Sequence, residues 1–545
     1  MLNHLINFLK IEGDLSFWKN VIVIASISGL ANAGLLALIN IGAELATNEG
    51  LNFRIFAMYV VVFLIFFITK KYSLFRASQE IERIIINVRE RISDKVRQSE
   101  LKAMESVDNS VIFTRLTQDT NIISQVGIIL TNSAQALMMM TFALIYILII
   151  SQLAFFVILG SVVVTVFLYR TFARDINIDL IEINSIEEKF FASLNGIISG
   201  FKELKVNTKK SDHLFREHKT IIDSLGTLKM QTSKKFVTNM MFTETFLYTL
   251  LGVIVFVLPH LVSEQSETII KVTAATLFII GPLDMTVSVL PTISRANISA
   301  KTLRDLEDLL DTEHDAPDIK KNSEIIESFD KIKLHDVEFH YLDKSGSRVF
   351  SIGPINLDIN RGEVIFIVGG NGSGKSTLVK ALLGLYFPQN GYISIDDEIV
   401  DDYNYQSYRE LFSIILGDFH LFKKLYGLGD VNAKIIKKLL IDMQLDKKTK
   451  FIDGEFTDID LSTGQRKRLA LIASILEDKP IYVFDEWAAD QDPEFRKHFY
   501  YEIIKDLKSQ GKTIIAVTHD DAYFDVADKI YKMEYGKIIS FKDAS

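Results

Sequence analysis

Six apolar runs occupy the first half of the chain, and they constrain the fold more than any other feature of the sequence. Each run is long enough to cross ~30 Å of hydrocarbon as an α-helix. The runs cover residues 20–42, 53–70, 123–150, 152–170, 237–258 and 269–290. The sequence therefore predicts an all-α transmembrane domain of six helices over residues 1–297.

The connections between these runs alternate in length and charge. Short segments that are nearly free of lysine and arginine join runs one and two, three and four, and five and six, whereas the other two connections are long and basic. By the positive-inside rule, the long connections and both termini are expected to be cytoplasmic. Their helical periodicity predicts helices that extend well beyond the membrane before they turn back.

The remainder of the chain has a different composition. Hydrophobic residues make up 48% of the 545 residues but concentrate in the first 295 positions. A charged stretch that contains Asp315-Ala316-Pro317-Asp318 predicts a linker over residues 298–328, followed by a soluble α/β domain over residues 329–545. The net charge of −9 comes without a basic face, so no nucleic-acid partner is expected, and the lack of cysteine excludes disulfides and thiolate metal sites.

A phosphate-binding loop lies in the predicted α/β domain. It fits G-x-x-x-x-G-K-[ST] between a β-rich run, 363–368, and a helix-like segment, 375–385. Glycines let backbone N–H groups approach anionic oxygens, Lys375 reaches the β- and γ-phosphates, and Ser376 holds Mg²⁺. The expected ATP-binding residues here are Gly369, Gly370, Asn371, Gly372, Ser373, Gly374, Lys375, Ser376 and Thr377. Such a loop joined to membrane spans predicts ATP-driven membrane work.

Three further segments follow the loop in order: residues 461–465, residues 481–486, and His519 after the predicted strand 513–517. Asp485 ends an apolar strand, where it can hold Mg²⁺ through water, and Glu486 beside it can orient or deprotonate the attacking water. We expect His519 to sense the γ-phosphate, although a lone histidine after a strand is more often structural.

Together, the loop and these three segments resemble the ABC transporter superfamily, and a six-span domain ahead of one nucleotide domain is similar to an exporter half-transporter. The resemblance implies that Tyr341 stacks on adenine. It also implies that a signature segment opens a helix toward the γ-phosphate held by the opposite subunit. The signature residues are Ser462, Thr463, Gly464 and Gln465. Because one copy cannot complete such a site, a homodimer with two shared ATP sites is expected.

Two positions depart from the family pattern. Thr463 stands where the signature usually has glycine, a modest change because Ser462 and Gly464 keep the helix start. Gly417 stands where the family usually has a glutamine that contacts Mg²⁺. Asp418, the next residue, is the candidate to take over this role as a metal ligand.

Two segments narrow the resemblance. Residues 484–495 read Phe-Asp-Glu-Trp-Ala-Ala-Asp-Gln-Asp-Pro-Glu-Phe, and residues 418–422 read Asp-Phe-His-Leu-Phe. Both resemble exporters of cyclic peptides and siderophores, including the pyoverdine-precursor type. That family implies movement of a peptide-derived product across the bacterial inner membrane toward the periplasm. It also implies that two arm tips, Arg115–Asp119 and Gly200–Lys205, dock on the ATP domains.

Two other functions are compatible with the same ATP site. One is an ATP-driven lipid or multidrug exporter, which has the same ATP-hydrolysing domain and a different cargo. The other, from a different class, is an ATP-gated channel or regulator. The intact Glu486 favours turnover over gating.

Several side chains outside the phosphate loop have two interpretations. Glu244 and Asp284, both inside apolar runs, line an inward-facing cargo entry or hydrogen-bond between helices. Met138–Met140 and Met240–Met241 adapt to a bulky cargo or simply pack against lipid and protein. Trp487 touches the opposite subunit or packs beneath its own loop. The sequence leaves these alternatives open.

Overall fold

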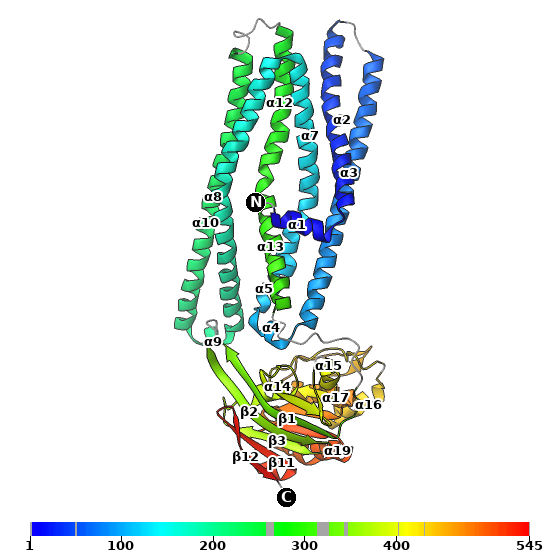
Figure 1. Cartoon of the computed structure of the whole chain (residues 1–545), viewed down its shortest axis with the longest axis vertical. Helices are drawn as coiled ribbons and strands as arrows, with labels where there is room; N and C mark the ends of the chain where they lie inside the picture. The colour runs from blue at the N-terminus through cyan, green and yellow to red at the C-terminus, as the bar shows by residue number, and fades with distance from the viewer. Residues whose placement is uncertain are drawn as a thin grey trace. The chain divides into compact units, whose positions relative to one another are not determined.

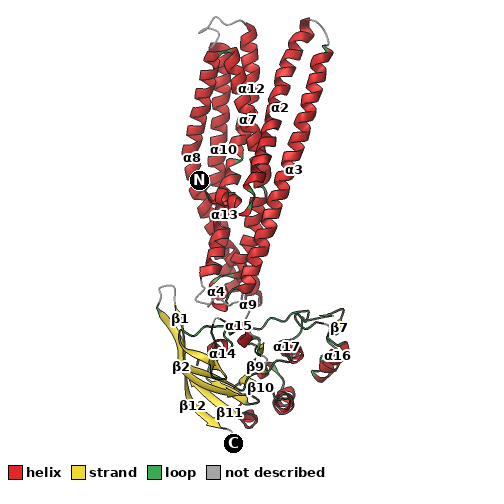
Figure 2. Cartoon of the chain, turned by 45° about the vertical axis from the view of Figure 1, so that its right-hand side comes forward, coloured by secondary structure: helices red, strands yellow, loops and turns green. Residues whose placement is uncertain are grey.

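A computed structural model of the chain describes residues 3–48, 52–257, 266–312, 326, 328–342, 347–401, 403–429 and 431–543. The chain divides into two compact units. The first comprises Met1–Ser99 and Met104–Asp311, and the second comprises Glu100–Ala103 and Thr312–Ser545. The first unit is helical, whereas the second combines strands and helices (Figure 2). This confirms the expected fold class of a helical domain followed by an α/β domain.

The first unit consists of long helices joined by short segments (Figure 1). Its elements are α1 (Asn3–Glu12), α2 (Leu15–Asn48), α3 (Phe53–Gln98), α4 (Leu101–Ser106, shared with the second unit), α5 (Asn109–Thr114), η1 (Arg115–Asp119), α6 (Thr120–Ser124), α7 (Val126–Ile150), α8 (Gln152–Ser199), α9 (Phe201–Val206), α10 (Thr208–Gly252), η2 (Val253–Val257), α12 (Ser266–Ser288) and α13 (Leu290–Thr312). At 1.5 Å per residue, the 46-residue α3 is about 70 Å long, roughly twice the hydrocarbon thickness. The expected helical arms are thus present.

The predicted spans coincide with helices. Within the described residues, four helical stretches are long and apolar enough to cross a membrane: Ser16–Gly42, Phe53–Gln98, Asn109–Ile150 and Thr208–Val257. The other two predicted spans contain shorter apolar helical stretches, Gln152–Val164 and Ile270–Leu283. Residue 258, the end of the fifth predicted span, lies outside the described residues.

Close backbone approach holds the helices of the first unit together. α2 packs on α3 and α7, α7 packs on α12, and α8 packs on α10 (Figure 1). On α7, a Cβ at Gly127 would lie 2.8 Å from Ala77 O of α3, so glycine is what lets these helices touch. The buried side chains of this region include Ile81, Ile84, Ile85, Val88, Leu303 and Leu306.

Helix α13 extends through the first part of the predicted linker, 298–328. It is helical because its apolar residues recur at helical spacing and are buried against α3. These residues are Ala300, Leu303, Leu306 and Leu310. Residues 313–325, which include Asp315-Ala316-Pro317-Asp318, lie outside the described residues.

The second unit contains a six-stranded sheet of order β12-β11-β3-β10-β9-β6 and a four-stranded sheet of order β2-β1-β4-β5. Its strands are β1 (Lys331–Leu342), β2 (Arg348–Asn360), β3 (Val364–Gly369), β4 (Asn390–Ile395), β5 (Glu398–Ile399), β6 (Phe412–Ile415), β7 (Phe451–Ile452), β8 (Glu455–Phe456), β9 (Ile481–Asp485), β10 (Thr513–Val517), β11 (Lys529–Glu534) and β12 (Lys537–Asp543). Its helices are α14 (Lys375–Leu382), α15 (Tyr405–Arg409), α16 (Ala433–Asp442), α17 (Thr463–Glu477), η3 (Trp487–Asp490), α18 (Pro493–His498), η4 (Phe499–Ile503), α19 (Ile504–Ser509) and η5 (Asp521–Val526).

The register of the larger sheet brings three of the predicted segments to one edge. β3, β10 and β9 are parallel neighbours, and Val517 pairs with both Ile367 and Asp485. Their carboxyl ends therefore coincide. In open α/β sheets, ligands bind at this edge.

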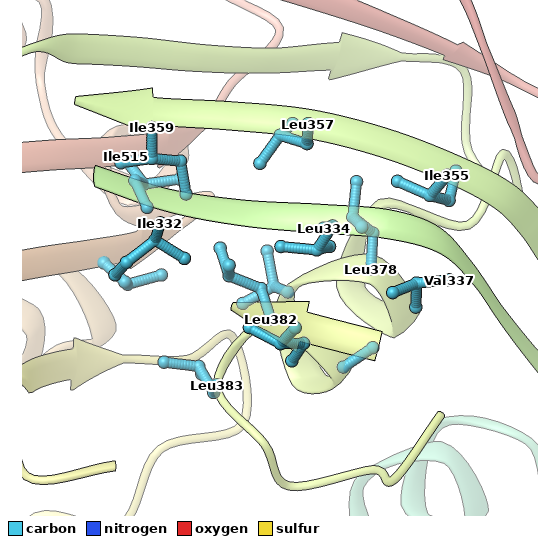
Figure 3. Packing of buried hydrophobic residues seen from close by; sticks show 14 of the residues in the cluster. Ile332, Leu334, Val337, Ile355, Leu357, Ile359, Leu378, Leu382, Leu383 and Ile515 are labelled. Atoms are coloured by element: carbon cyan, nitrogen blue, oxygen red, sulfur yellow. The ribbon is translucent and has the colours of Figure 1, made fainter. Parts of the chain in front are cut away.

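An apolar core fixes helix α14 against the strands. Leu334 of β1 and Leu357 of β2 lie in one cluster with Leu378 and Leu382 of α14, and Ile515 of β10 belongs to the same cluster (Figure 3). All five side chains are buried. Because α14 is anchored along its length, the loop that precedes it has a defined position.

Candidate functional site

The phosphate loop connects β3 to α14, as the sequence predicts. Gly369 ends the buried strand with φ 152°, and a Cβ there would lie 2.3 Å from Met533 O, so only glycine fits. Gly374, with φ 102°, precedes the first turn of α14. The loop thus directs its backbone N–H groups and the positive end of α14 to one place, which suits an anionic phosphate.

Two side chains of the loop are buried. Lys375 donates from Nζ to Gly369 O at 3.0 Å and to Gly370 O at 3.1 Å, so its ammonium lies across the loop. Ser373 Oγ is buried and has no hydrogen-bond partner among the described residues. The exposed members of the loop are Gly370, Asn371, Gly372 and Ser376, and Thr377 is half-buried.

Asp485, at the end of β9, is a buried carboxylate next to Ser376. It accepts a hydrogen bond from the Ser376 side chain, while its Oδ1 has no partner among the described residues. Burial, together with the neighbouring Glu486 charge, raises the pKa of Asp485 although Ser376 and Lys375 act against this shift. The negative charge of this carboxylate is incompletely compensated, and its Oδ1 is free to act as a ligand. The carboxylate therefore suits a divalent cation such as Mg²⁺.

Protein ligands for such a cation are few. Within the described residues, no group of three or more histidine, aspartate or glutamate side chains could hold a metal ion. Mg²⁺ commonly takes one or two protein ligands and completes its shell with water and substrate phosphates. Ser376 and Asp485 are suited to that arrangement.

Glu486 and His519 form a pair at the same edge of the sheet. Glu486 has left-handed backbone angles, φ 51° and ψ 34°, and its N–H donates to Val517 O at 3.1 Å. Glu486 Oε1 lies 3.3 Å from His519 Nε2, and the two side chains are 43% and 46% exposed. An accessible carboxylate in this place can hold a water molecule beside a phosphate.

The signature residues begin helix α17. The Ser462 N–H donates to Gln465 Oε1 at 3.3 Å, and Gln491 Nε2 donates to Gly464 O at 3.1 Å. A Cβ at Gly464 would lie 2.5 Å from a backbone oxygen, so this glycine is required by packing. Ser462 and Thr463 are exposed. Within the described residues, the hydrogen bonds of the signature lead to the loop after β9 and not to the phosphate loop.

Tyr341 lies in an aromatic cluster on β1. Its ring packs edge-on against Phe339, with centroids 5.2 Å apart, and its hydroxyl donates to the Tyr386 hydroxyl at 3.0 Å. Tyr341 pairs across the sheet with Phe350, whose ring borders Gly374 of the phosphate loop. Tyr341 is therefore one strand away from the loop, and its stacking on adenine stays a prediction.

The turn after β6 borders the buried carboxylate. A Cβ built on Gly417 would lie 4.0 Å from Asp485 Oδ2. The Arg466 guanidinium of α17 lies over the Phe419 ring, 5.8 Å from its centroid. Asp418 is exposed. Its role as a metal ligand stays a prediction.

Buried side chains hold the loop after β9. Trp487 was a candidate from the sequence, whereas Lys467 and Arg468 were not. Trp487 is buried, donates from Nε1 to Lys467 O at 2.9 Å and stacks on Phe499 with centroids 4.2 Å apart, which supports the packing interpretation. Arg468 donates from Nε to Gln491 Oε1 at 2.8 Å. Lys467 and Arg468 belong to a charge run that, in one sequence, cannot be told from a solvated helix face.

The candidate cargo residues lie in the helices of the first unit. Glu244 is half-buried on α10, and the side chain of Asp284 on α12 lies outside the part of the structure that is described. Met139 accepts a hydrogen bond from Asn32 Nδ2 at 3.2 Å and is buried, which favours packing for this residue. Met140 is also buried, whereas Met138, Met240 and Met241 are exposed.

Asp119, in the first predicted arm tip, is held by side chains of its own unit. Asp119 is buried, accepts hydrogen bonds from Ser299 and Thr302 at 2.8 Å each, and pairs with Arg115 at 3.1 Å. All four residues belong to the first unit. Because a buried carboxylate needs such partners, Asp119 is held firmly within the first unit. Docking of Arg115–Asp119 on the ATP domain stays a prediction.

The segment that groups with the second unit is Glu100–Ala103. Glu100 accepts hydrogen bonds from Arg409 at 3.1 and 2.6 Å, and Arg409 also contacts the Phe387 and Tyr405 rings. Gly200–Lys205 lies in the expected turn between α8 and α10.

The loop, the buried carboxylate and the Glu486–His519 pair define an ATPase joined to membrane helices, and comparison with known proteins agrees. The ABC transporter family model matches residues 352–489. The ATP-binding protein SyrD of Pseudomonas syringae pv. syringae is 32% identical over 533 residues, which cover 94% of this chain and 92% of SyrD.

Two further similarities are more distant. An ATP-dependent lipid A-core flippase of Aliivibrio fischeri is 27% identical over 285 residues, 50% of this chain and 47% of the flippase. The structure of a bacterial Atm1-family ABC exporter with ATP bound matches with a TM-score of 0.81 over 97% of this chain and 96% of that chain. At 15% identity, that match shows the fold alone.

The chain belongs to the ABC transporters, and it has the arrangement of an exporter half-transporter. It is a multi-pass membrane protein that binds ATP and couples ATP hydrolysis to transport.

Proposed function

We propose that this ABC transporter moves a peptide-derived product, such as a cyclic peptide, a siderophore precursor or a peptide antibiotic, from the cytoplasm to the periplasm across the bacterial inner membrane. The observation that carries the proposal is the extent of similarity to SyrD, which continues through the membrane half and covers 94% of the chain. The segments 418–422 and 484–495 add the resemblance to exporters of cyclic peptides and siderophores.

The geometry supports a division of labour at the ATP site. Lys375 and the loop Gly369–Thr377 bind the phosphates, and Glu486 acts as the general base, with His519 beside it. Ser376 and Asp485 would hold Mg²⁺, which neutralises phosphate charge when bound. Tyr341 and Asp418 complete the assignment as the adenine contact and the additional metal contact.

The complete site requires two copies. Ser462–Gln465 sit at the exposed start of α17, whereas their own phosphate loop lies at the end of β3. In a homodimer, the signature of one copy closes over ATP held by the other. Closure of two ATP sites switches the membrane helices from inward-open to outward-open, and hydrolysis resets them.

A second candidate is the export of a lipid or drug by the same engine. The similarity to the lipid A-core flippase favours it, although that similarity covers only half of each chain. The two candidates differ in cargo and not in mechanism.

Uptake into inverted membrane vesicles tests the proposal. We expect ATP-dependent accumulation of a peptide-derived product against its gradient, identified by mass spectrometry, and no accumulation in vesicles that carry Glu486→Gln. Accumulation of labelled lipid in place of any peptide would favour the second candidate. Passive, gradient-driven flux on ATP addition would contradict both.

A further inference from the structure

The catalytic edge contains a buried lysine for which the proposed mechanism has no role. Lys467, on α17, is 3% exposed. Its Nζ donates to Glu486 O at 2.8 Å and pairs with Asp490 Oδ2 at 2.7 Å. Lysine is almost never fully buried unless its charge is paired, because removing an ammonium from water costs several kcal/mol. The position of Lys467 is therefore a specific arrangement rather than a surface contact.

The loop after β9 also bonds to the backbone of Lys467. Trp487 Nε1 donates to Lys467 O at 2.9 Å, and the Trp487 ring is buried against Phe499. Lys467 thus contacts three residues of one short loop: Glu486 through its carbonyl, Trp487 through its indole and Asp490 through its carboxylate. The loop cannot shift without breaking a buried hydrogen bond.

The backbone of Glu486 shows why this matters. Its φ of 51° is in the left-handed region, which costs a residue with a side chain on the order of 1 kcal/mol. On one side, the Glu486 N–H is bonded to Val517 O; on the other, its carbonyl is bonded to Lys467. These two bonds fix the direction of the Cα–Cβ bond, and the carboxylate thereby meets His519 at 3.3 Å.

We infer that Lys467 is a positioning residue for ATP hydrolysis: its ammonium holds Glu486 in the left-handed conformation that aims the carboxylate at the attacking water. This inference rests on the proposed role of Glu486 as the general base. Lys467 itself reaches the backbone of the loop and not the nucleotide. Its loss therefore affects the hydrolysis step and spares ATP binding.

Steady-state ATPase measurements on the full-length protein in lipid nanodiscs separate positioning from simple stabilisation. We expect Lys467→Met to lower kcat about tenfold, because a misplaced catalytic group loses rate steeply, while the KM for ATP stays within about twofold. Lys467→Arg should recover most of the rate. Lys437→Met, at an exposed lysine of α16, is the matched control and should behave as wild type. A wild-type kcat, or parallel loss of kcat and nucleotide binding, would overturn the inference.

A double-mutant cycle with Glu486→Gln tests whether Lys467 acts through Glu486. In single-turnover hydrolysis, Lys467→Met should cause no further loss in the Glu486→Gln background, because the group that it positions is already gone. A full additional tenfold loss would show that Lys467 acts elsewhere. If Glu486→Gln alone retained the wild-type rate, the general-base assignment would fail whatever Lys467 does.

A second variant covers the case in which Lys467→Met does not fold. Asp490→Asn leaves α17 and Trp487 intact and removes only the partner carboxylate, which is 44% exposed. We expect kcat to fall about threefold at unchanged KM, less than for Lys467→Met, because the bond to Glu486 O remains. A wild-type kcat for this variant, with Lys467→Met unfolded, would overturn the inference.

Discussion

The two parts of the ATP site differ in how far their polar groups are satisfied within one copy of the chain. On the phosphate-loop side, Asp485 Oδ1 and Ser373 Oγ are buried without partners among the described residues. On the signature side, Gln491 accepts from Arg468 and donates to Gly464. The phosphate-loop side therefore has polar atoms that are free to bind a ligand, whereas Gln491 on the signature side already has its hydrogen-bond partners.

This difference assigns separate roles to the phosphate-loop side and the signature side of the site. A buried polar group without a partner costs roughly 1–3 kcal/mol, which a ligand recovers when it binds. The phosphate-loop side is therefore where nucleotide and cation supply the missing contacts. The signature side needs no ligand to keep its shape, so it can present Ser462 and Thr463 as a rigid surface to a second copy.

The largest expected effect is at Glu486, on the side that awaits its ligand. Glu486→Gln should lower ATP hydrolysis by at least about 100-fold, the usual contribution of a general base, without weakening ATP binding. Phosphate release and binding of a fluorescent ATP analogue, measured on the same preparation, check this. Full retention of hydrolysis would remove Glu486 from the chemistry.

Replacement of Asp485 should raise the stability of the protein and lower its activity. Its raised pKa means that the buried negative charge opposes folding at neutral pH, a cost that is relieved as the pH falls through the raised value. Asp485→Asn should therefore raise the melting temperature of the nucleotide-free protein at neutral pH, while Mg²⁺-dependent hydrolysis falls roughly 10- to 100-fold.

Thermal melting in detergent, with and without Mg²⁺ and ATP, measures both consequences for Asp485. Asp446→Asn, at an exposed carboxylate after α16, is the control and should change neither. A lower melting temperature for the nucleotide-free Asp485→Asn protein would contradict the comparison between the two sides.

On the signature side, the effect should be on stability. Arg468→Met removes hydrogen bonds to Gln491 and Asp492 and leaves the buried Gln491 Oε1 without its donor, which should cost about 1–3 kcal/mol of unfolding free energy. Denaturant or thermal unfolding measures it. Arg466→Met, at an exposed arginine two residues away, should cost far less. Equal losses would mean that this network does not hold the signature side.

The smallest effect is expected at Thr463. Its side chain is exposed at the start of α17, so Thr463→Gly should change ATPase activity by only about twofold, the equivalent of ±0.5 kcal/mol. A steady-state ATPase assay checks this prediction. A loss of tenfold or more would show that the departure from the usual signature glycine carries a function of its own.

Much of the fold followed from sequence because its signals are local. Apolar length predicted the helices, and the phosphate-loop pattern, with the acidic pair Asp485–Glu486 at a strand end, placed its residues at one sheet edge. The boundary between the helical domain and the linker was harder to place. Helix α13 continues to Thr312 through a charged stretch, because its leucines recur at helical spacing.

The rest depends on partners that are distant in sequence. Asp119 pairs with Ser299 and Thr302, about 180 residues further along the chain, and no local pattern predicts these contacts. The burial of Lys467 depends on a loop about twenty residues downstream, and a charge run gives no sign of it. Side-chain networks of this kind arise from tertiary packing, which periodicity does not encode.

Mixing two inactive variants tests the central claim, that each ATP site is shared between two copies. Copies with Glu486→Gln and copies with Ser462→Arg should each be inactive alone as homodimers. A mixed dimer, isolated through two different affinity tags, combines one doubly damaged site with one intact site, so ATP hydrolysis should reappear. Purified mixed dimers that stay as inactive as either parent would show that each copy builds its ATP site alone, against this account.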